Sequence, residues 1–255
     1  MNELNEKLND KKSFQVFITS HSPTITAKAD LNSLIILQRD YENENVVCAD
    51  FKSLRFKKEN KEYLHKFLDV TKSQLLFSKR VIFVEGISEA LLLPVFAKKL
   101  KKDLDEKGVE VVMLNGINFK HFLPLFYEDN PLIFKGTIIT DDDRKEINGK
   151  PSKTYENLTK MENKNLEVHG AVKTFEYELL ICNKKESIIH QTFKEVHPQN
   201  FKNVTIATNE ELFDIFNSKK KIKKADIALI LSTKLDDDNH EIPEYISDAI
   251  KFVCE

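Results

Sequence analysis

Carboxylates that directly follow apolar runs are the residues of this chain best placed to do chemistry. Glu85 comes immediately after the run 81–84, and Asp141 and Asp143 follow the run 137–140. Such runs, rich in β-branched residues, are typical of buried strands in a parallel sheet. In an extended stretch Asp141 and Asp143 point to the same side, because side chains alternate with a period of two. Carboxylates gathered at strand ends predict a site for a hard cation such as Mg²⁺ or Mn²⁺.

Two further acids belong to the same candidate site. Glu89 lies in the first turn of a helix that we expect to begin at Ser88, close enough to Glu85 to share a metal ion or a proton. Glu176 follows an expected short strand, 172–175, and Glu178 could take its place. Neighbouring unpaired carboxylates raise one another's pKa, and a bound cation resolves the repulsion. The alternatives are an acid that stabilises a helix N-terminus, for Glu89, and an exposed strand residue, for Glu176.

Other acidic residues fit the site less well. Asp142 points away from its two neighbours if the stretch is extended, and Asp236 to Asp238 have no apolar strand before them. We expect both groups to be solvated turns.

The elements that must position these acids form a repeated strand–helix unit. The first unit is the strand 81–84 with a helix that Ser88 caps, and the second is the strand 109–114 with a short helix at 119–126. The turn between this second strand and its helix contains Asn115, Gly116 and Asn118. This alternation predicts an α/β fold with a mostly parallel sheet, in which ligands bind at the carboxyl ends of the strands.

The joint pattern resembles the TOPRIM domain of topoisomerases, primases and certain nucleases. Its parts are Val-Glu-Gly-x-x-Glu at 84–89, the glycine-bearing turn, and Thr-Asp-x-Asp at 140–143. The flanking motifs resemble the OLD (overcoming lysogenisation defect) family of ATPase-nucleases, to which the Gabija nuclease subunit also belongs. These motifs occupy residues 63–79, 174–180, 224–228 and 242–253.

The resemblance implies a metal-dependent endodeoxyribonuclease with a Rossmann-like TOPRIM sheet and a helical insertion. Two Mg²⁺ or Mn²⁺ ions would activate a water molecule and stabilise the leaving 3′ oxygen. The metal ligands that it implies are Glu85, Glu89, Asp141, Asp143 and Glu176. The catalytic residues would be Glu85, Asp141 and Lys224, where Lys224 corresponds to the lysine that contacts the scissile phosphate. Ala225 stands where the family usually has glycine, and the lysines at 219, 220, 221 and 223 form a basic run beside it.

The N-terminal segment resembles the last part of an ABC-type ATPase head. Residues 14–19 are expected to form a strand that ends near His21, which in the family senses the nucleotide γ-phosphate, and residues 34–38 a further strand. The sequence has no Gly-x-x-x-x-Gly-Lys-Ser/Thr loop to cradle phosphates, so we expect no ATP hydrolysis by this chain alone. We therefore interpret it as a fragment or a truncated form whose ATPase domain is missing.

Composition limits the remaining classes. The net charge of −2 offers no global basic field for coating nucleic acid. Cys48, Cys182 and Cys254 are widely spaced and show no metal-ligand pattern, so we expect reduced thiols in a cytoplasmic protein. The sequence contains no apolar run of membrane-spanning length and no signal peptide, which predicts no membrane association.

We expect five segments along the chain. They are an ATPase remnant (1–40), a linker and helix (41–78, with the helix at 62–77), a TOPRIM core (79–182), a helical insert (183–222) and C-terminal TOPRIM helices (223–255). Residues 144–165 are expected to be a mobile loop.

Two functions of different classes remain open. The first is a DNA endonuclease that nicks or cuts both strands, in a homo-oligomeric ATPase-nuclease used in phage defence or DNA processing. The alternative is a catalytically silent TOPRIM module that regulates assembly and depends on the ATPase domain. A topoisomerase or primase is disfavoured, because the sequence shows neither a strand-passage region nor a primase zinc motif.

Overall fold

The computed structural model describes most of the chain. It covers residues 15–40, 44–54, 56–68, 72–116, 119–127, 135–144, 148–202, 204–218, 223–235 and 239–255.

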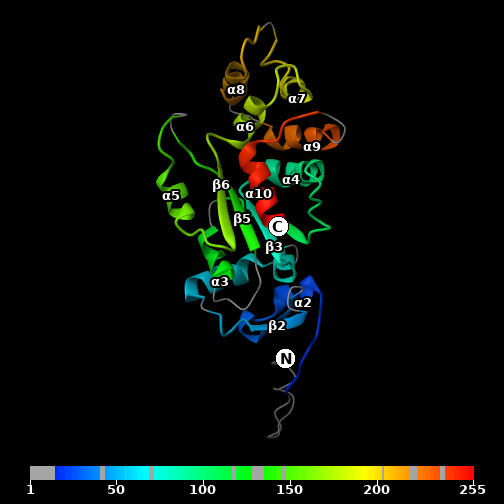
Figure 1. Cartoon of the computed structure of the whole chain (residues 1–255), viewed down its shortest axis with the longest axis vertical. Helices are drawn as coiled ribbons and strands as arrows, with labels where there is room; N and C mark the ends of the chain where they lie inside the picture. The colour runs from blue at the N-terminus through cyan, green and yellow to red at the C-terminus, as the bar shows by residue number, and fades with distance from the viewer. Residues whose placement is uncertain are drawn as a thin grey trace.

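A four-stranded parallel sheet lies at the centre of the molecule (Figure 1). Its strands are β3 (Arg80–Val84), β4 (Val109–Met113), β5 (Lys135–Asp141) and β6 (Leu166–Ala171), in the spatial order β4-β3-β5-β6. Each pair is parallel. The chain passes from β3 to β4 on one side and then crosses back to β5 on the other, so the order reverses between β3 and β5.

Both faces of the sheet are buried, as the apolar runs predict. In β3, Ile82 and Val84 belong to one hydrophobic cluster, whereas Val81 and Phe83 belong to a second. The period of two along the strand sends alternate side chains to opposite faces. The molecule therefore has a layer of elements on each side of the sheet.

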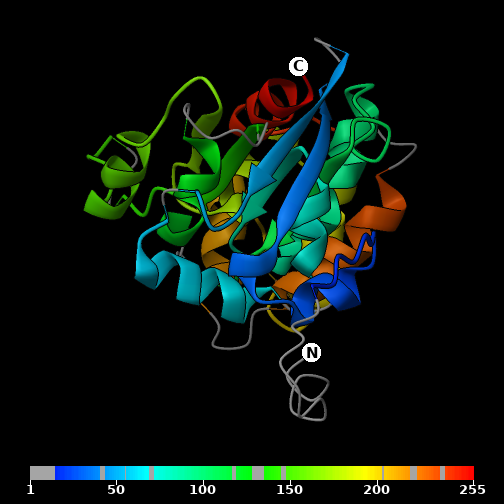
Figure 2. The ribbon, with the colours of Figure 1, turned by 90° about the horizontal axis from the view of Figure 1, so that it is seen from below.

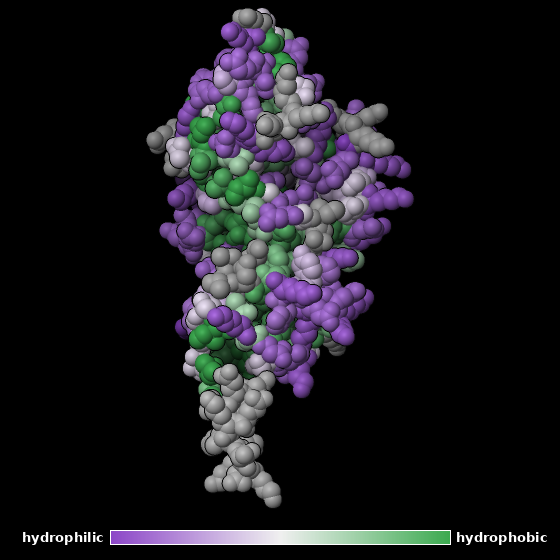
Figure 3. Space-filling view, turned by 180° about the vertical axis from the view of Figure 1, so that it is seen from behind, coloured by the Kyte–Doolittle hydropathy of each residue, from purple (hydrophilic) through white to green (hydrophobic). Residues whose placement is uncertain are grey.

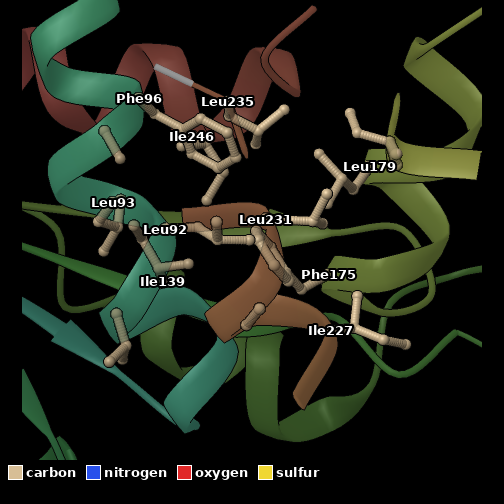
Figure 4. Close-up of a cluster of buried hydrophobic side chains, with 14 of the residues drawn as sticks. Leu92, Leu93, Phe96, Ile139, Phe175, Leu179, Ile227, Leu231, Leu235 and Ile246 are labelled. Atoms are coloured by element: carbon tan, nitrogen blue, oxygen red, sulfur yellow. The ribbon is translucent and has the colours of Figure 1, made fainter. Parts of the chain in front are cut away.

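The first layer consists of α4 and of helices from the C-terminal half of the chain (Figures 1 and 4). Its inner helices are α4 (Ile87–Lys99), α6 (Phe175–Cys182), α9 (Lys224–Lys234) and α10 (Glu244–Cys254). Figure 4 shows Leu92, Leu93 and Phe96 of α4 beside Leu231 of α9 in one buried cluster. The helices α7 (Ile188–Val196) and α8 (Asn209–Asn217) extend this layer away from the sheet.

The second layer is built from shorter elements (Figure 2). It contains α3 (Lys58–Phe67), α5 (Lys153–Thr159), and the short 3₁₀ helices η2 (Lys72–Phe77), η3 (Phe119–His121) and η4 (Leu123–Phe126). Gly136 of β5 permits close packing here, because an added Cβ would lie 2.4 Å from the ring of Phe126.

An antiparallel hairpin completes this layer at the N-terminal end. It pairs β1 (Ile35–Asp40) with β2 (Asn45–Asp50), after α2 (Pro23–Lys28) and η1 (Leu31–Ser33). Ala49 is buried, whereas Ile35, Leu37 and Val46 are exposed, and Figure 3 shows hydrophobic surface at this end of the molecule.

The predicted strands at the sheet are confirmed, but several connecting segments were predicted wrongly. The linker 41–61 contains β2 and the start of α3, the helix 62–77 is split between α3 and η2, and the loop 144–165 contains α5. The short helix at 119–126 consists of two 3₁₀ turns.

The strand predicted at 14–19 is absent from its described part. Residues 15–22 belong to no helix or strand, and Val16, Phe17 and Ile18 are exposed. A strand needs a neighbour to pair its backbone N–H and C=O groups, so apolar composition alone does not form one. The strand at 34–38 is confirmed as β1.

No helix among the described residues is both long and apolar enough to cross a membrane. The proposed segment boundaries stay predictions.

Candidate metal centre and active site

Glu85 and Asp141 lie at the point where the strand order reverses. Glu85 directly follows β3, and Asp141 is the last residue of the neighbouring strand β5. The crevice outside the strand ends at such a switch point is where open α/β sheets bind ligands. Thr140 donates its hydroxyl hydrogen bond to Glu85 Oε1, so the second strand also orients the carboxylate of the first.

Glu89 reaches the same place from the first turn of α4. Its side chain is buried, with 9% of its surface exposed. Gly86 makes room for it, because a Cβ at that position would lie 3.0 Å from Glu89 Oε2. Gly86 is also the N-cap of α4, which corrects the prediction that Ser88 caps this helix.

Glu176 and Lys224 form an ion pair beside these acids. Lys224 Nζ lies 2.8 Å from Glu176 Oε2, and Glu176 is buried. The Ser88 hydroxyl donates to Glu176 Oε1 at 3.3 Å, so Ser88 holds a carboxylate instead of capping a helix. Lys224 is the first residue of α9.

The strand predicted at 172–175 is wrong, although Glu176 still reaches the site. The strand β6 ends at Ala171, and Thr174 caps α6 by accepting a hydrogen bond from the backbone N–H of Tyr177. Glu176 therefore stands in the first turn of a helix, where an acid interacts favourably with the helix dipole.

The electrostatics show that these acids form one cluster. The pKa of Asp141 is raised to about 8, chiefly by burial and then by repulsion from Glu85, Glu89 and Glu176. Burial likewise raises the pKa of Glu89 to about 7, with Glu176 and Glu85 contributing. The pKa of Glu85 is also raised, chiefly by burial, with Asp143 adding to the effect and the Thr140 hydrogen bond opposing it.

Lys224 is the nearby positive charge. Burial, the largest single effect, disfavours its ammonium form, but the charge and hydrogen bond of Glu176 together with the charges of Asp141 and Glu89 outweigh burial, so the pKa of Lys224 is raised. Lys224 contacts one of the four carboxylates Glu85, Glu89, Asp141 and Glu176. The raised pKa values of Asp141 and Glu89 mean that protons relieve the repulsion among the acids without a cation, and a divalent cation would take the place of these protons.

The three consecutive aspartates do not behave as one extended stretch. The strand ends at Asp141, and Asp143 is exposed with a left-handed φ of 50°. The prediction that Asp141 and Asp143 lie in one extended stretch is therefore wrong, because the strand ends between them. Asp143 still acts electrostatically on Glu85.

Asp142 is not the solvated turn residue that the sequence predicted. It is 2% exposed, and Arg144 Nε contacts both its carboxylate oxygens, at 3.0 and 2.7 Å. Its backbone is also bonded, since Asp142 N donates to Ala171 O and Ser152 N donates to Asp142 O. The sequence reasoning missed Arg144, although a basic residue directly after the acidic motif was a visible signal.

The donor chemistry fits a hard cation, although the side chains are not gathered around one point. Among the described residues, no group of three His, Cys, Asp or Glu side chains is arranged to hold a metal ion. Two of the carboxylates are instead held by protein donors, Glu85 by Thr140 and Glu176 by Ser88 and Lys224. All of the donors are carboxylates, and oxygen ligands suit Mg²⁺ and Mn²⁺.

Several other predicted residues lie elsewhere. Glu178 accepts a hydrogen bond from Val172 N at 3.0 Å, and Asp142 and Arg144 act on it electrostatically, so it does not replace Glu176 in the cluster. His21 is exposed, and its ring lies 4.6 Å from the ring of Phe77. The lysines at 219–221, the aspartates at 236–238 and Asn118 lie outside the described residues.

Comparison with known proteins gives three kinds of similarity. The family model described as "Overcoming lysogenization defect protein-like, TOPRIM domain" matches residues 76–143, which include β3, β4, β5 and the acids Glu85, Glu89, Asp141 and Asp143. The chain is 27% identical to Endonuclease GajA of Bacillus cereus (strain VD045) over 148 residues, which are 58% of this chain. The match spans about a quarter (24%) of that relative's length.

Two solved structures also resemble the chain. The C-terminal region of the Burkholderia pseudomallei OLD protein is 23% identical, with a TM-score of 0.49, and the match covers 70% of this chain and 98% of that one. The C-terminal region of the Xanthomonas campestris pv. campestris OLD protein is 22% identical, also with a TM-score of 0.49, and the match covers 71% and 94%. The motifs of the sheet and the matching family model identify residues 76–143 as a TOPRIM domain of the OLD-like type.

Proposed function

We propose that this chain is the nuclease part of an OLD-type protein and hydrolyses phosphodiester bonds in DNA with Mg²⁺ or Mn²⁺. The observation that carries the proposal is the cluster of Glu85, Glu89, Asp141 and Glu176 at the switch point of the sheet, with Lys224 beside it. The similarity to Endonuclease GajA supports the same reaction class.

The carboxylates would hold the cation. Glu85 and Asp141 stand on the rigid sheet, which makes them the central ligands, and Glu89, Glu176 and Asp143 would complete the set. Two bound ions would supply an activated water and stabilise the charge of the leaving oxygen. Glu85 and Glu176 would exchange their bonds to Thr140 and Lys224 for bonds to the cation.

Lys224 would act on the substrate. When a cation takes over Glu176, the Lys224 ammonium is released from its ion pair at 2.8 Å and becomes available to the scissile phosphate. A positive group aimed at developing negative charge lowers the barrier of the reaction. The DNA substrate, a homo-oligomeric assembly with an ATPase domain, and a role in phage defence or DNA processing are parts of the same proposal.

A second candidate is a catalytically silent TOPRIM module that regulates assembly. The observation that favours it is the absence, among the described residues, of three acids arranged around one point. In that case the Lys224–Glu176 pair would be a permanent structural contact.

Nicking of supercoiled plasmid DNA separates the two candidates. We expect the purified chain to nick DNA with Mn²⁺, and Glu85→Ala and Asp141→Ala to lose both nicking and Mn²⁺ binding. Glu110→Ala is the matched control, because Glu110 is a partly buried acid of β4 whose pKa is raised by burial and by Asp105, not by the cluster. Equal nicking by all variants would mean that the activity lies elsewhere, and no nicking by the parent would favour the silent module.

A further inference from the structure

Tyr245 belongs to the closing motif of the chain, and the carboxylate site as described gives it no role. It is the second residue of α10, and its hydroxyl oxygen is buried without a hydrogen-bond partner among the described residues. A buried phenol usually finds a partner, because an unpaired O–H in the protein interior is unfavourable. We therefore expect a nearby group that can accept a hydrogen bond from the Tyr245 hydroxyl.

The direction of α10 brings Tyr245 to the carboxylate edge of the sheet. At the far end of the helix, Arg80 of β3 donates to Glu255 O at 3.5 Å, and Lys135 of β5 lies over the ring of Phe252. Arg80 and Lys135 are the first residues of their strands, so α10 runs antiparallel to them. A helix of this length spans roughly 16 Å, about the length of a five-residue strand.

The surroundings of Tyr245 confirm this position. The helix α10 packs against α4, β3, β5 and β6, which carry or precede the acids of the site. Burial raises the pKa of the Tyr245 phenol well above its usual range, and repulsion from Glu89 and then Asp141 raises it further. The phenol therefore lies close enough to Glu89 and Asp141 for their charges to act on it.

Among these acids, Glu89 and Asp141 receive no side-chain hydrogen bond from the described residues, and Glu89 is the more deeply buried of the two and acts more strongly on Tyr245. Glu85 accepts from Thr140, Glu176 accepts from Ser88 and Lys224, and Glu178 accepts from the Val172 backbone. Within the described part of the chain no side chain donates to Glu89, although it is buried.

We propose that Tyr245 is a positioning residue, whose hydroxyl donates a hydrogen bond to the ionised Glu89 carboxylate when that carboxylate binds a cation. The inference rests on the proposed function. A hydrogen bond to the ligating carboxylate fixes its orientation, and loss of such outer partners typically weakens metal binding about 10- to 100-fold. Tyr245 would thus act through Glu89 and would not touch the DNA.

Mn²⁺ affinity tests the inference without relying on nuclease activity. The free Mn²⁺ signal in electron paramagnetic resonance would be titrated with the parent, Tyr245→Phe, Glu89→Gln and the double variant. We expect Tyr245→Phe to weaken binding about tenfold and to have no further effect when Glu89 is already Gln. Tyr127→Phe is the matched control, because Tyr127 is 44% exposed.

Melting curves without divalent cations provide the second readout. Tyr245→Phe removes only an unpaired hydroxyl, so we expect its melting temperature to equal that of the parent or to rise slightly. Mn²⁺ affinity equal to that of Tyr127→Phe, or an equal loss in the Glu89→Gln background, would overturn the role of Tyr245 while leaving the metal site in place. Failure of the parent to bind Mn²⁺ would overturn the proposed function and this inference together.

Discussion

Removing the positive charge of Arg144 should destabilise the protein, because it leaves a buried aspartate without its partner. Asp142 is 2% exposed and Arg144 21%. The guanidinium contacts both carboxylate oxygens, and the backbone N–H of Arg144 also donates to Asp142 at 3.0 Å. We therefore choose Arg144→Met, which keeps an apolar side chain of similar length and removes the charge.

The magnitude follows from the burial of the pair. Breaking a fully buried ion pair from one side costs about 3–5 kcal/mol. The exposure of Arg144 and the backbone donor that remains for Asp142 lower this figure, so we expect a loss of about 2–3 kcal/mol in the free energy of unfolding. For a chain of this size that corresponds to a fall of about 4–12 °C in melting temperature.

Urea and thermal unfolding without divalent cations would measure the effect. The double variant Asp142→Asn with Arg144→Met should recover much of the loss, because no uncompensated charge stays buried. Lys153→Met is the control for removing an exposed cation on α5. A free energy of unfolding for Arg144→Met within about 0.5 kcal/mol of that for Lys153→Met, a difference typical of surface substitutions, would contradict this prediction.

Three other predictions address the carboxylate cluster. Asp141 has a pKa of about 8 in the folded chain against an ordinary value of 3.8, so the native state keeps a proton that the unfolded state releases. Stability without cations should therefore fall as pH rises from about 4 to 8, and melting curves at pH 5 and pH 8 should show a smaller fall for Asp141→Asn. Gly86→Ala should displace the Glu89 carboxylate, since the new Cβ would lie 3.0 Å from Glu89 Oε2. We expect calorimetry to show Mn²⁺ binding weakened severalfold, and an unchanged Mn²⁺ affinity would show that Glu89 is not a ligand. Lys224→Ala should slow plasmid nicking strongly but bind Mn²⁺ at least as well as the parent, because the substitution frees Glu176 from its ion pair. A parallel loss of Mn²⁺ affinity would contradict the proposal that Lys224 acts on the scissile phosphate.

The strands and their terminal acids could be predicted from sequence because the signal is local. The strands β3 and β5 contain the short β-branched runs 81–84 and 137–140, and Glu85 and Asp141 directly follow these runs. The parallel sheet followed from the same patterns.

The contacts between distant segments could not be read from local patterns. Ser88 and Glu176 are 88 positions apart, and Lys224 and Glu176 are 48 apart, so nothing in either neighbourhood indicates the partner. Glu176 was predicted to follow a short strand at 172–175, whereas Thr174 caps a helix there. The burial of Asp142 likewise depends on the fold of the segment around Ser152, which packs over it.

The most direct test of the account is to locate the cation. Crystals of the chain soaked with Mn²⁺ would be measured at a wavelength where manganese scatters anomalously. We expect anomalous density between the carboxylates of Glu85 and Asp141, with Glu176 released from Lys224. Protein that nicks DNA with Mn²⁺, yet shows its anomalous density elsewhere and keeps the Lys224–Glu176 pair intact, would contradict it.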